Sequence, residues 1–260
     1  MIHTVKIVQS CLSSVIEAGK GMAGTSRPIQ PVKMLELYDM EGCPYCRRVR
    51  EVMTSLNIDF FVKPCPKAGS LYRNEIARHL SKPTYPTLHD PNTGVYLSES
   101  QDIILYLYDN YSNKKIPKSL ANLPRVEVQG MLVSAASMLR GIKADPDRDP
   151  SKITEPLELY SFEGSPYSRP VRERLCELEI SYICHNVAKE RWQDAGPAIL
   201  RLKPGPYHPK AGGKRELLQQ NALSKKVQVP FLVDPNYGVQ MYESAKIIRY
   251  LNLTYARPTA

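Results

Sequence analysis

Two cysteines spaced one helical turn apart are the residues of this chain best suited to chemistry. They form the segment Cys43-Pro44-Tyr45-Cys46, which follows a short apolar stretch at residues 35–38. A proline suits the first turn of a helix, where its missing N–H costs nothing. The segment therefore predicts a strand that runs directly into a helix over residues 44–56.

A thiol at the start of a helix faces unpaired backbone N–H groups and the positive end of the helix dipole. Both favour the thiolate, and such positions lower a cysteine pKa from about 8.5 to between about 3.5 and 7.5. We expect Cys43 to be the nucleophile and Cys46 to be the resolving thiol that attacks the mixed disulfide. Arg47 and Arg48 follow at once; they either stabilise a thiolate or anionic ligand, or are ordinary solvated arginines.

A zinc site is the main alternative for this pair of cysteines. Structural zinc normally takes four ligands, often from two paired motifs. The chain has no second CxxC segment, and Cys65 with His79 or His89 would complete a site only by coincidence. We therefore expect no metal.

The chain repeats itself. Residues 35–50, LELYDMEGCPYCRRVR, return at residues 157–172 as LELYSFEGSPYSRPVR, and residues 83–107 return at residues 227–251. Two long blocks in the same order indicate two copies of one domain. A shorter match between residues 66–69 and 209–212 puts the extra length of the second copy around residues 188–208.

Each copy predicts the same order of elements: strand, helix, strand, helix, two short strands and a last helix. In the first copy these are residues 35–38, 44–56, 58–62, 71–80, a hairpin turning at 90–94, and 100–108. A strand–helix–strand crossover implies parallel pairing, and a tight turn implies antiparallel pairing. The expected fold is α/β, with a small mixed sheet and covering helices in each copy.

The repeat also divides the chain. We expect an N-terminal helix, with apolar residues at helical spacing from Val5 to Ile16, and a linker within residues 1–33. The first domain then spans residues 34–111 and the second spans residues 157–260. Residues 112–156 join them through a helix at residues 126–142.

Composition limits the partners. The net charge is +9, but lysine and arginine are spread along the 260 residues without a dense basic run, so we expect no nucleic acid. No stretch approaches the ~20 apolar residues that span a bilayer. Of the six cysteines, only Cys43 and Cys46 are spaced as a functional pair. The N-terminus lacks the pattern of a signal peptide. We expect a reducing compartment, the cytoplasm, and leave organellar targeting open.

Three features occur in order in each copy: the CPYC or SPYS segment, an X-Pro pair that opens a later strand, and a Glu-Ser pair. Together they resemble the glutaredoxins and the N-terminal domain of glutathione transferases, arranged in tandem over residues 35–111 and 157–253. The resemblance implies two thioredoxin-like domains joined by a helical linker. It also implies glutathione as co-substrate, and glutathionylated proteins or small disulfides as substrates.

The resemblance assigns a glutathione site in the first copy. Its cis-proline loop matches Tyr85-Pro86, although the family usually has a small β-branched residue where Tyr85 stands, and its γ-glutamyl site matches Glu99-Ser100. The expected glutathione-binding residues are Pro44, Tyr45, Tyr85, Pro86, Glu99 and Ser100.

Three further residues near this site remain open. Lys67 and Arg73 either meet the glycine carboxylate of glutathione or are solvated surface residues. Cys65 is either an additional resolving thiol or, as free cysteines more commonly are, an inert buried residue.

The second copy has serine at both thiol positions, Ser165 and Ser168, so dithiol exchange is excluded there. Some glutathione transferases use a serine at this place to hold the thiolate of bound glutathione. The expected second glutathione site consists of Ser165, Val229, Pro230, Glu243 and Ser244. The alternative is a purely structural domain.

Three functions follow. The leading hypothesis is a glutathione-dependent thiol–disulfide oxidoreductase. A glutathione transferase is the second, although those enzymes normally carry an all-helical domain that the single helix at residues 126–142 is too short to replace. The third is a non-enzymatic glutathione-binding or interaction module.

Overall fold

A computed structural model describes residues 21–121, 140–191, 207–222 and 226–257. The helix expected near the N-terminus and most of the helix expected at residues 126–142 lie outside these ranges. The domain boundaries proposed from the repeat remain predictions. We call residues 35–121 the first half and residues 157–257 the second half.

The first half follows the predicted order of elements. It contains β1 (Leu35–Asp39), α2 (Pro44–Leu56), β2 (Phe60–Pro64), α3 (Leu71–Ile76), β3 (Thr87–Asp90), β4 (Val95–Leu97), α4 (Ser100–Tyr111) and α5 (Lys118–Ala121). The helix expected at residues 71–80 ends at Ile76, and residues up to Leu80 continue as hydrogen-bonded turns. The helix expected at residues 100–108 continues to Tyr111.

The second half repeats this order after the short 3-10 helix η1 (Pro150–Lys152). It contains β5 (Leu157–Ser161), α7 (Arg169–Glu177), β6 (Tyr182–Asn186), α8 (Lys214–Asn221), β7 (Phe231–Asp234), β8 (Val239–Tyr242) and α9 (Ser244–Tyr255). One difference matters for the site. Helix α2 begins at Pro44, whereas α7 begins only at Arg169, after the Ser-Pro-Tyr-Ser segment has formed a turn.

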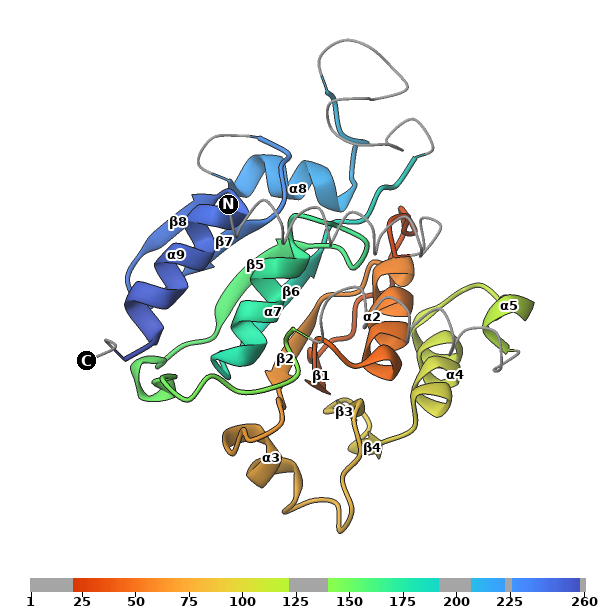
Figure 1. The fold of residues 1–260 in the computed structure, drawn as a ribbon. Helices are drawn as coiled ribbons and strands as arrows, with labels where there is room; N and C mark the ends of the chain where they lie inside the picture. Colours follow the sequence, from red (N-terminus) through yellow and green to blue (C-terminus); the bar gives the residue numbers. More distant parts are fainter. Residues whose placement is uncertain (1–20, 122–139, 192–206, 223–225, 258–260) are drawn as a thin grey trace.

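The strands of both halves form one eight-stranded sheet, in the order β4-β3-β1-β2-β6-β5-β7-β8. Within each half, the first two strands pair in parallel and the hairpin pairs antiparallel, as the repeat predicts. The halves meet where β2 and β6 pair antiparallel, with Phe61 opposite Ile183. Figure 1 shows the two halves side by side, with β2 and β6 between them at the centre of the sheet.

One apolar core extends through both halves. It contains Leu37 and Phe60 from the first half and Leu159 and Tyr182 from the second. Helix α2 packs against α4, and α7 packs against α9 in the same way. The halves therefore share a sheet and a core, and they are not separate bodies joined only by a linker.

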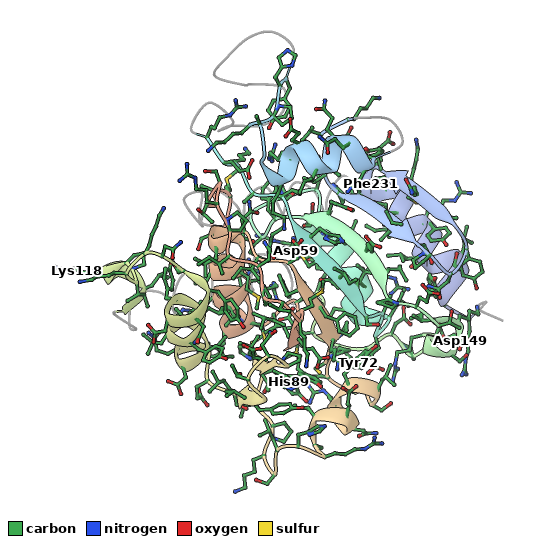
Figure 2. All side chains as sticks on the ribbon, turned by 180° about the vertical axis from the view of Figure 1, so that it is seen from behind. Asp59, Tyr72, His89, Lys118, Asp149 and Phe231 are labelled. Atoms are coloured by element: carbon green, nitrogen blue, oxygen red, sulfur yellow. The ribbon has the colours of Figure 1, made fainter. Side chains whose placement is uncertain are left out.

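Two short segments cross between the halves. We call residues 21–25 the first strap and residues 141–145 the second strap. The first strap precedes the first half but pairs with Lys189 beyond β6, and the second strap pairs with Lys67 beyond β2. Figure 2 shows Asp59 near the middle of the molecule, where it contacts His185 and Lys214 of the second half.

Candidate active site

The Cys43-Pro44-Tyr45-Cys46 segment stands at the turn from β1 into α2. Cys43 is the N-cap residue, with extended backbone angles (φ −79°, ψ 128°), and Pro44 opens the helix. Cys46 lies one turn inside α2 and is fully buried, whereas Cys43 retains 8% of its surface and Tyr45 retains 38%. The first thiol is therefore nearer to solvent, as the sequence predicts.

The surroundings of the two thiols shift their acidities in opposite directions. The Cys46 thiol and then the backbone N–H groups of Cys46 and Tyr45 hydrogen-bond the Cys43 sulfur and, against the effect of burial, lower the pKa of Cys43 to about 7. Burial raises the pKa of Cys46 well above its usual range, and the contact with Cys43 adds to the rise. One thiolate near neutral pH is therefore favoured, at Cys43.

The predicted proline loop lies beside this thiol. The Tyr85-Pro86 peptide bond is cis, and the Cys43 Sγ lies 3.9 Å from the Tyr85 carbonyl oxygen. The Tyr85 ring is stacked by the Arg73 guanidinium, 4.6 Å from the ring centroid. The large residue before the proline is thus held by a neighbouring cation.

Arg73 and Lys67 differ in their contacts. Arg73 donates to the carbonyl oxygens of Pro66 (2.7 Å) and Cys65 (2.9 Å), so it is not a solvated surface residue. The Lys67 side chain is exposed, while its backbone pairs with the second strap. Arg73 therefore helps to shape the proline loop, whereas the Lys67 side chain is exposed.

The Glu-Ser pair of the first half marks the start of α4. Glu99 is the exposed N-cap residue with extended backbone angles, and Ser100 is the buried first residue of the helix. Because α4 packs against α2, the pair belongs to the helix layer that also carries the two thiols. The structure therefore brings Cys43, Cys46 and the proline loop into contact, and it puts Glu99 and Ser100 on the adjoining helix.

The second half keeps the frame without the thiols. Val229-Pro230 is also cis, but Ser165 and Ser168 are buried and their hydroxyl oxygens lie 2.9 Å apart. Glu243, before the buried Ser244, has a left-handed backbone (φ 71°) that is rare for a residue with a side chain. The hydroxyls of Ser165 and Ser168 thus bond each other, while the Glu-Ser turn has an unusual conformation.

A family model described as the glutathione S-transferase N-terminal domain matches residues 37–115 and, a second time, residues 159–259. The chain belongs to this family. Both the predicted family and the mixed α/β fold built from two thioredoxin-like segments are confirmed. Searches of curated proteins and of solved structures find no match.

The glutathione S-transferase N-terminal domain family implies a function connected with glutathione. Among the described residues, no group of three His, Cys, Asp or Glu side chains is arranged to hold a metal ion. His79 and His89 each stack on the Tyr96 ring. In the same part of the chain, no helix has the length and apolar character needed to cross a membrane.

Cys65 is fully buried at the end of β2. Its Sγ lies 3.5 Å from the Lys63 carbonyl oxygen, and burial raises the pKa of this thiol far above neutrality. A neutral, enclosed thiol is a poor nucleophile. The buried, inert alternative therefore describes Cys65 better than a third redox thiol.

Arg47 and Arg48, which the sequence left open, are both buried. Arg48 donates to the Gln101 side chain on α4 at 3.2 Å. The solvated alternative is therefore wrong for both residues, because each is almost completely removed from solvent.

A buried ion cluster, which the sequence did not lead us to expect, adjoins the thiol loop. Arg50 contacts Asp39 (2.7 Å) and Glu163 (2.9 Å), and Arg172 contacts Glu41 (3.1 Å) and Glu163 (3.0 Å). Burial raises the pKa of Glu41, whereas Arg172 and Arg50 hold the pKa of Glu163 below its usual range despite burial. The signal was present in the repeat, which keeps a glutamate and an arginine at matching positions in both copies.

Proposed function

We propose that this protein is a glutathione-dependent thiol–disulfide oxidoreductase, with Cys43 as nucleophile and Cys46 as resolving thiol. The observation that carries the proposal is the Cys43 sulfur at the start of α2, with its pKa lowered to about 7. A thiol that ionises near ambient pH is close to the optimum for attack on a disulfide. Cys46, buried one turn away, is protected from external disulfides until Cys43 has reacted.

The proposed reaction is thiol–disulfide exchange. The Cys43 thiolate attacks the glutathione sulfur of a glutathionylated protein, a Cys43–glutathione disulfide forms, and the protein leaves as its thiolate. A second glutathione thiolate then attacks the glutathione sulfur of this disulfide and forms glutathione disulfide, or Cys46, after losing its proton, attacks the Cys43 sulfur and forms a Cys43–Cys46 disulfide. The Cys43 thiolate or reduced glutathione leaves, and further glutathione reduces any Cys43–Cys46 disulfide.

In this proposal the loop before Pro86 holds the bound glutathione. The Tyr85 backbone, whose carbonyl oxygen lies near the Cys43 sulfur, would pair with the cysteinyl part of glutathione. Glu99 would pair with the γ-glutamyl amino group, and the N–H groups at the start of α4, by Ser100, would receive its carboxylate. Pro44 and the half-exposed Tyr45, which follow the nucleophile at the start of α2, would complete the site. We also propose a reducing compartment, the cytoplasm, because the reaction consumes reduced glutathione.

Glutathione transfer to an electrophile is the second candidate, and the family to which the chain belongs is the observation that favours it. Transfer needs a glutathione thiolate, whereas exchange needs an enzyme thiolate. The two reactions therefore differ in their dependence on Cys43. Non-enzymatic glutathione binding is the third candidate and requires neither thiolate.

The deciding experiment runs two assays on the full chain. One measures glutathione-dependent reduction of a glutathionylated peptide, and the other measures conjugation of glutathione to a chlorodinitrobenzene electrophile. We expect reduction in the wild type and its loss in Cys43→Ser, with Cys184→Ser, a buried cysteine away from the motif, as the matched control. Conjugation without reduction would replace the proposal by the transferase, and glutathione binding with neither activity would leave the binding module.

A further inference from the structure

The loop that carries Cys43 is held by the second half of the chain. The Glu41 backbone N–H points to the Cys176 sulfur on α7 at 3.5 Å, and the Glu41 carboxylate meets Arg172 on the same helix at 3.1 Å. The Gly42 N–H donates to the Gly141 carbonyl oxygen of the second strap at 3.2 Å. Both residues before the nucleophile are thus bound by groups from beyond residue 140.

The second half receives the reciprocal contacts from the first. The Glu163 backbone N–H donates to the Thr54 hydroxyl oxygen at 3.1 Å, and its carboxylate meets Arg50 at 2.9 Å. The Gly164 N–H donates to the Gly21 carbonyl oxygen of the first strap at 2.8 Å. Thr54 and Cys176 therefore occupy matching places, each holding the loop of the opposite half.

The contacts around Gly42 leave no room for a side chain. A Cβ atom at Gly42 would lie 2.5 Å from the Arg140 carbonyl oxygen and 2.5 Å from the Ile142 Cγ1 atom. The Cys176 thiol also donates to the Gly141 carbonyl oxygen at 3.2 Å. Cys176 thus joins the second strap to the thiol loop, and burial, which raises its pKa well above the usual range, keeps it a hydrogen-bond donor.

We propose that the second half of the chain positions the nucleophile of the first. Cys176, Arg172 and the second strap hold residues 41–43 in the geometry in which the Cys43 sulfur meets the N–H groups at the start of α2. The SPYS half thereby acts on the redox reaction without a thiol of its own. The proposal rests on the proposed function only in taking Cys43 as the reactive thiol.

The mechanism is geometric. The Cys43 sulfur is hydrogen-bonded by Cys46 and by backbone N–H groups of the first turn, and such bonds weaken steeply with distance and angle. If the contacts of Glu41 and Gly42 are lost, residues 41–43 can shift and the Cys43 sulfur can move away from these hydrogen-bond donors. The thiolate then loses its stabilisation, although the CPYC residues themselves are unchanged.

The test compares two matched single substitutions, Cys176→Ala and Thr54→Ala, each made in the full chain. Each removes the side-chain acceptor of one loop N–H, but only Cys176 holds the loop of Cys43. The rate of Cys43 alkylation by iodoacetamide is followed from pH 5 to 10 by peptide mass spectrometry, after circular dichroism has shown that both variants are folded. Cys176→Thr, which supplies the hydroxyl found at Thr54, is the rescue variant.

We expect Cys176→Ala to move the alkylation midpoint upward by about 0.5–1 pH unit, which slows labelling at pH 6 about three- to ten-fold. Thr54→Ala should keep the wild-type midpoint, and Cys176→Thr should return towards it. A folded Cys176→Ala with the same midpoint as Thr54→Ala would overturn the proposal.

If Cys176→Ala does not fold, Gly42→Ala replaces it. The added methyl group would push against the second strap and so disturb the contact between this strap and the thiol loop. An unchanged midpoint there would likewise overturn the proposal. Alkylation of Cys43 needs no glutathione, so this test is independent of the proposed reductase activity. Absence of reductase activity would refute the proposed function. The pH midpoints of Cys43 alkylation would still decide the present inference.

Discussion

At the scale of single residues, the two thiols of one motif have opposite acid–base behaviour. Cys43 caps the helix and takes hydrogen bonds that favour its thiolate, whereas Cys46 is enclosed and bonds to Cys43 as a thiol. The sequence CPYC is nearly symmetric, so this asymmetry comes from the places of the two residues, with Cys43 before the first turn of α2 and Cys46 enclosed within it. The N–H groups at the start of α2 point towards Cys43, the N-cap residue, whereas Cys46 is the buried third residue of the helix.

Alkylation at pH 6 should label Cys43 far faster than Cys46. With a pKa of about 7, about a tenth of Cys43 is thiolate at pH 6, whereas the raised pKa of Cys46 leaves almost none. Peptide mass spectrometry after brief iodoacetamide treatment of the full chain measures both rates. Cys65, buried and with a raised pKa, is the internal negative control. Equal labelling of Cys43 and Cys46 would contradict the assignment of the nucleophile.

The Cys46→Ser variant should keep activity on glutathionylated peptides, because glutathione itself can resolve the Cys43–glutathione disulfide. We expect its rate to stay within about ten-fold of the wild type, while Cys43→Ser has no activity above background. A Cys46→Ser variant as inactive as Cys43→Ser would mean that turnover passes through an obligatory Cys43–Cys46 disulfide.

At the scale of elements, the turns before α4 and α9 differ although both contain Glu-Ser. Glu99 has extended backbone angles, whereas Glu243 has a positive φ of 71°. Such conformations cost free energy and gather at ligand-binding sites. The second half thus has an unusual turn at the place where the family resemblance puts the γ-glutamyl end of glutathione.

We therefore predict a second, non-covalent glutathione site in which Glu243 binds the ligand's amino group. S-methylglutathione, which forms no disulfide, should bind the full chain at two sites in calorimetric titration. Losing one charge-assisted contact costs about 1.5–3 kcal/mol, so Glu243→Ala should weaken one site about ten- to a hundred-fold. Glu99→Ala is the matched variant of the other site. A single site that is indifferent to Glu243→Ala would mark the second half as structural.

The junction of β2 and β6 contains His185, whose protonation contributes to the stability of the fold. His185 lies 3.2 Å from Asp59 of the first half and 2.9 Å from Glu158 on β5. Although burial opposes it, the hydrogen bonds with Asp59 and Glu158 raise the pKa of His185 to about 9. A pKa raised above the unfolded value of about 6.5 stabilises the fold below pH 6.5, and this contribution disappears as the pH rises to 9.

His185→Gln should accordingly lower the free energy of unfolding by about 1–3 kcal/mol at pH 6, and by much less at pH 9. Urea titrations at the two pH values measure the difference. His79→Gln, which replaces an exposed histidine stacked on Tyr96, is the control and should show little change at either pH. A His185→Gln effect that is equal at pH 6 and pH 9 would exclude the charged histidine as its cause.

At the scale of the whole molecule, the two halves should unfold together. They share one sheet, one core and a buried cluster in which Arg50 and Arg172 each contact both Glu41 and Glu163. Removing one partner of a buried ion pair leaves an uncompensated charge and costs about 3–5 kcal/mol. Arg50→Met should therefore destabilise both halves by about this amount.

Hydrogen exchange in urea, read by mass spectrometry, tests this prediction because it reports on each half separately. Peptides from β1 and β5 should lose protection at the same urea concentration in the wild type, and at a lower shared concentration in Arg50→Met. Lys246→Met, which breaks the exposed pair with Glu243, should leave the concentration nearly unchanged. Loss of protection in one half while the other stays protected would show that the halves fold independently.

Local features of the fold could be predicted from the sequence because their signals are local. Pro44 marks the start of α2, and the Asp90–Gly94 turn marks the hairpin. The pairing of β2 with β6 could not be predicted, since an apolar strand carries no mark of the edge it will pair with. The burial of Arg50 and Arg172 was marked only weakly, because the repeat keeps an arginine at both positions but does not show which carboxylates they will meet.

The straps show a signal that was present but weak. Gly21 and Gly141 hold equivalent places in the structure, and in the sequence Val8-Gln9 precedes the first as Val128-Gln129 precedes the second. The repeat therefore begins well before residue 35. Only the crossed hydrogen bonds of Gly42 and Gly164 make this short likeness recognisable.

The near-symmetry of the two halves has a consequence for how such a protein can change. In an assembly of two identical subunits, exchanging a cysteine for serine would remove both redox centres at once. Here a single polypeptide supplies both halves, so the two copies can differ at equivalent positions. The second half has Ser165 at the position of Cys43 and Ser161 at the position of Asp39. Covalent fusion thus allows a division of labour, in which one copy is free to specialise as a support while its twin keeps the reactive sulfur.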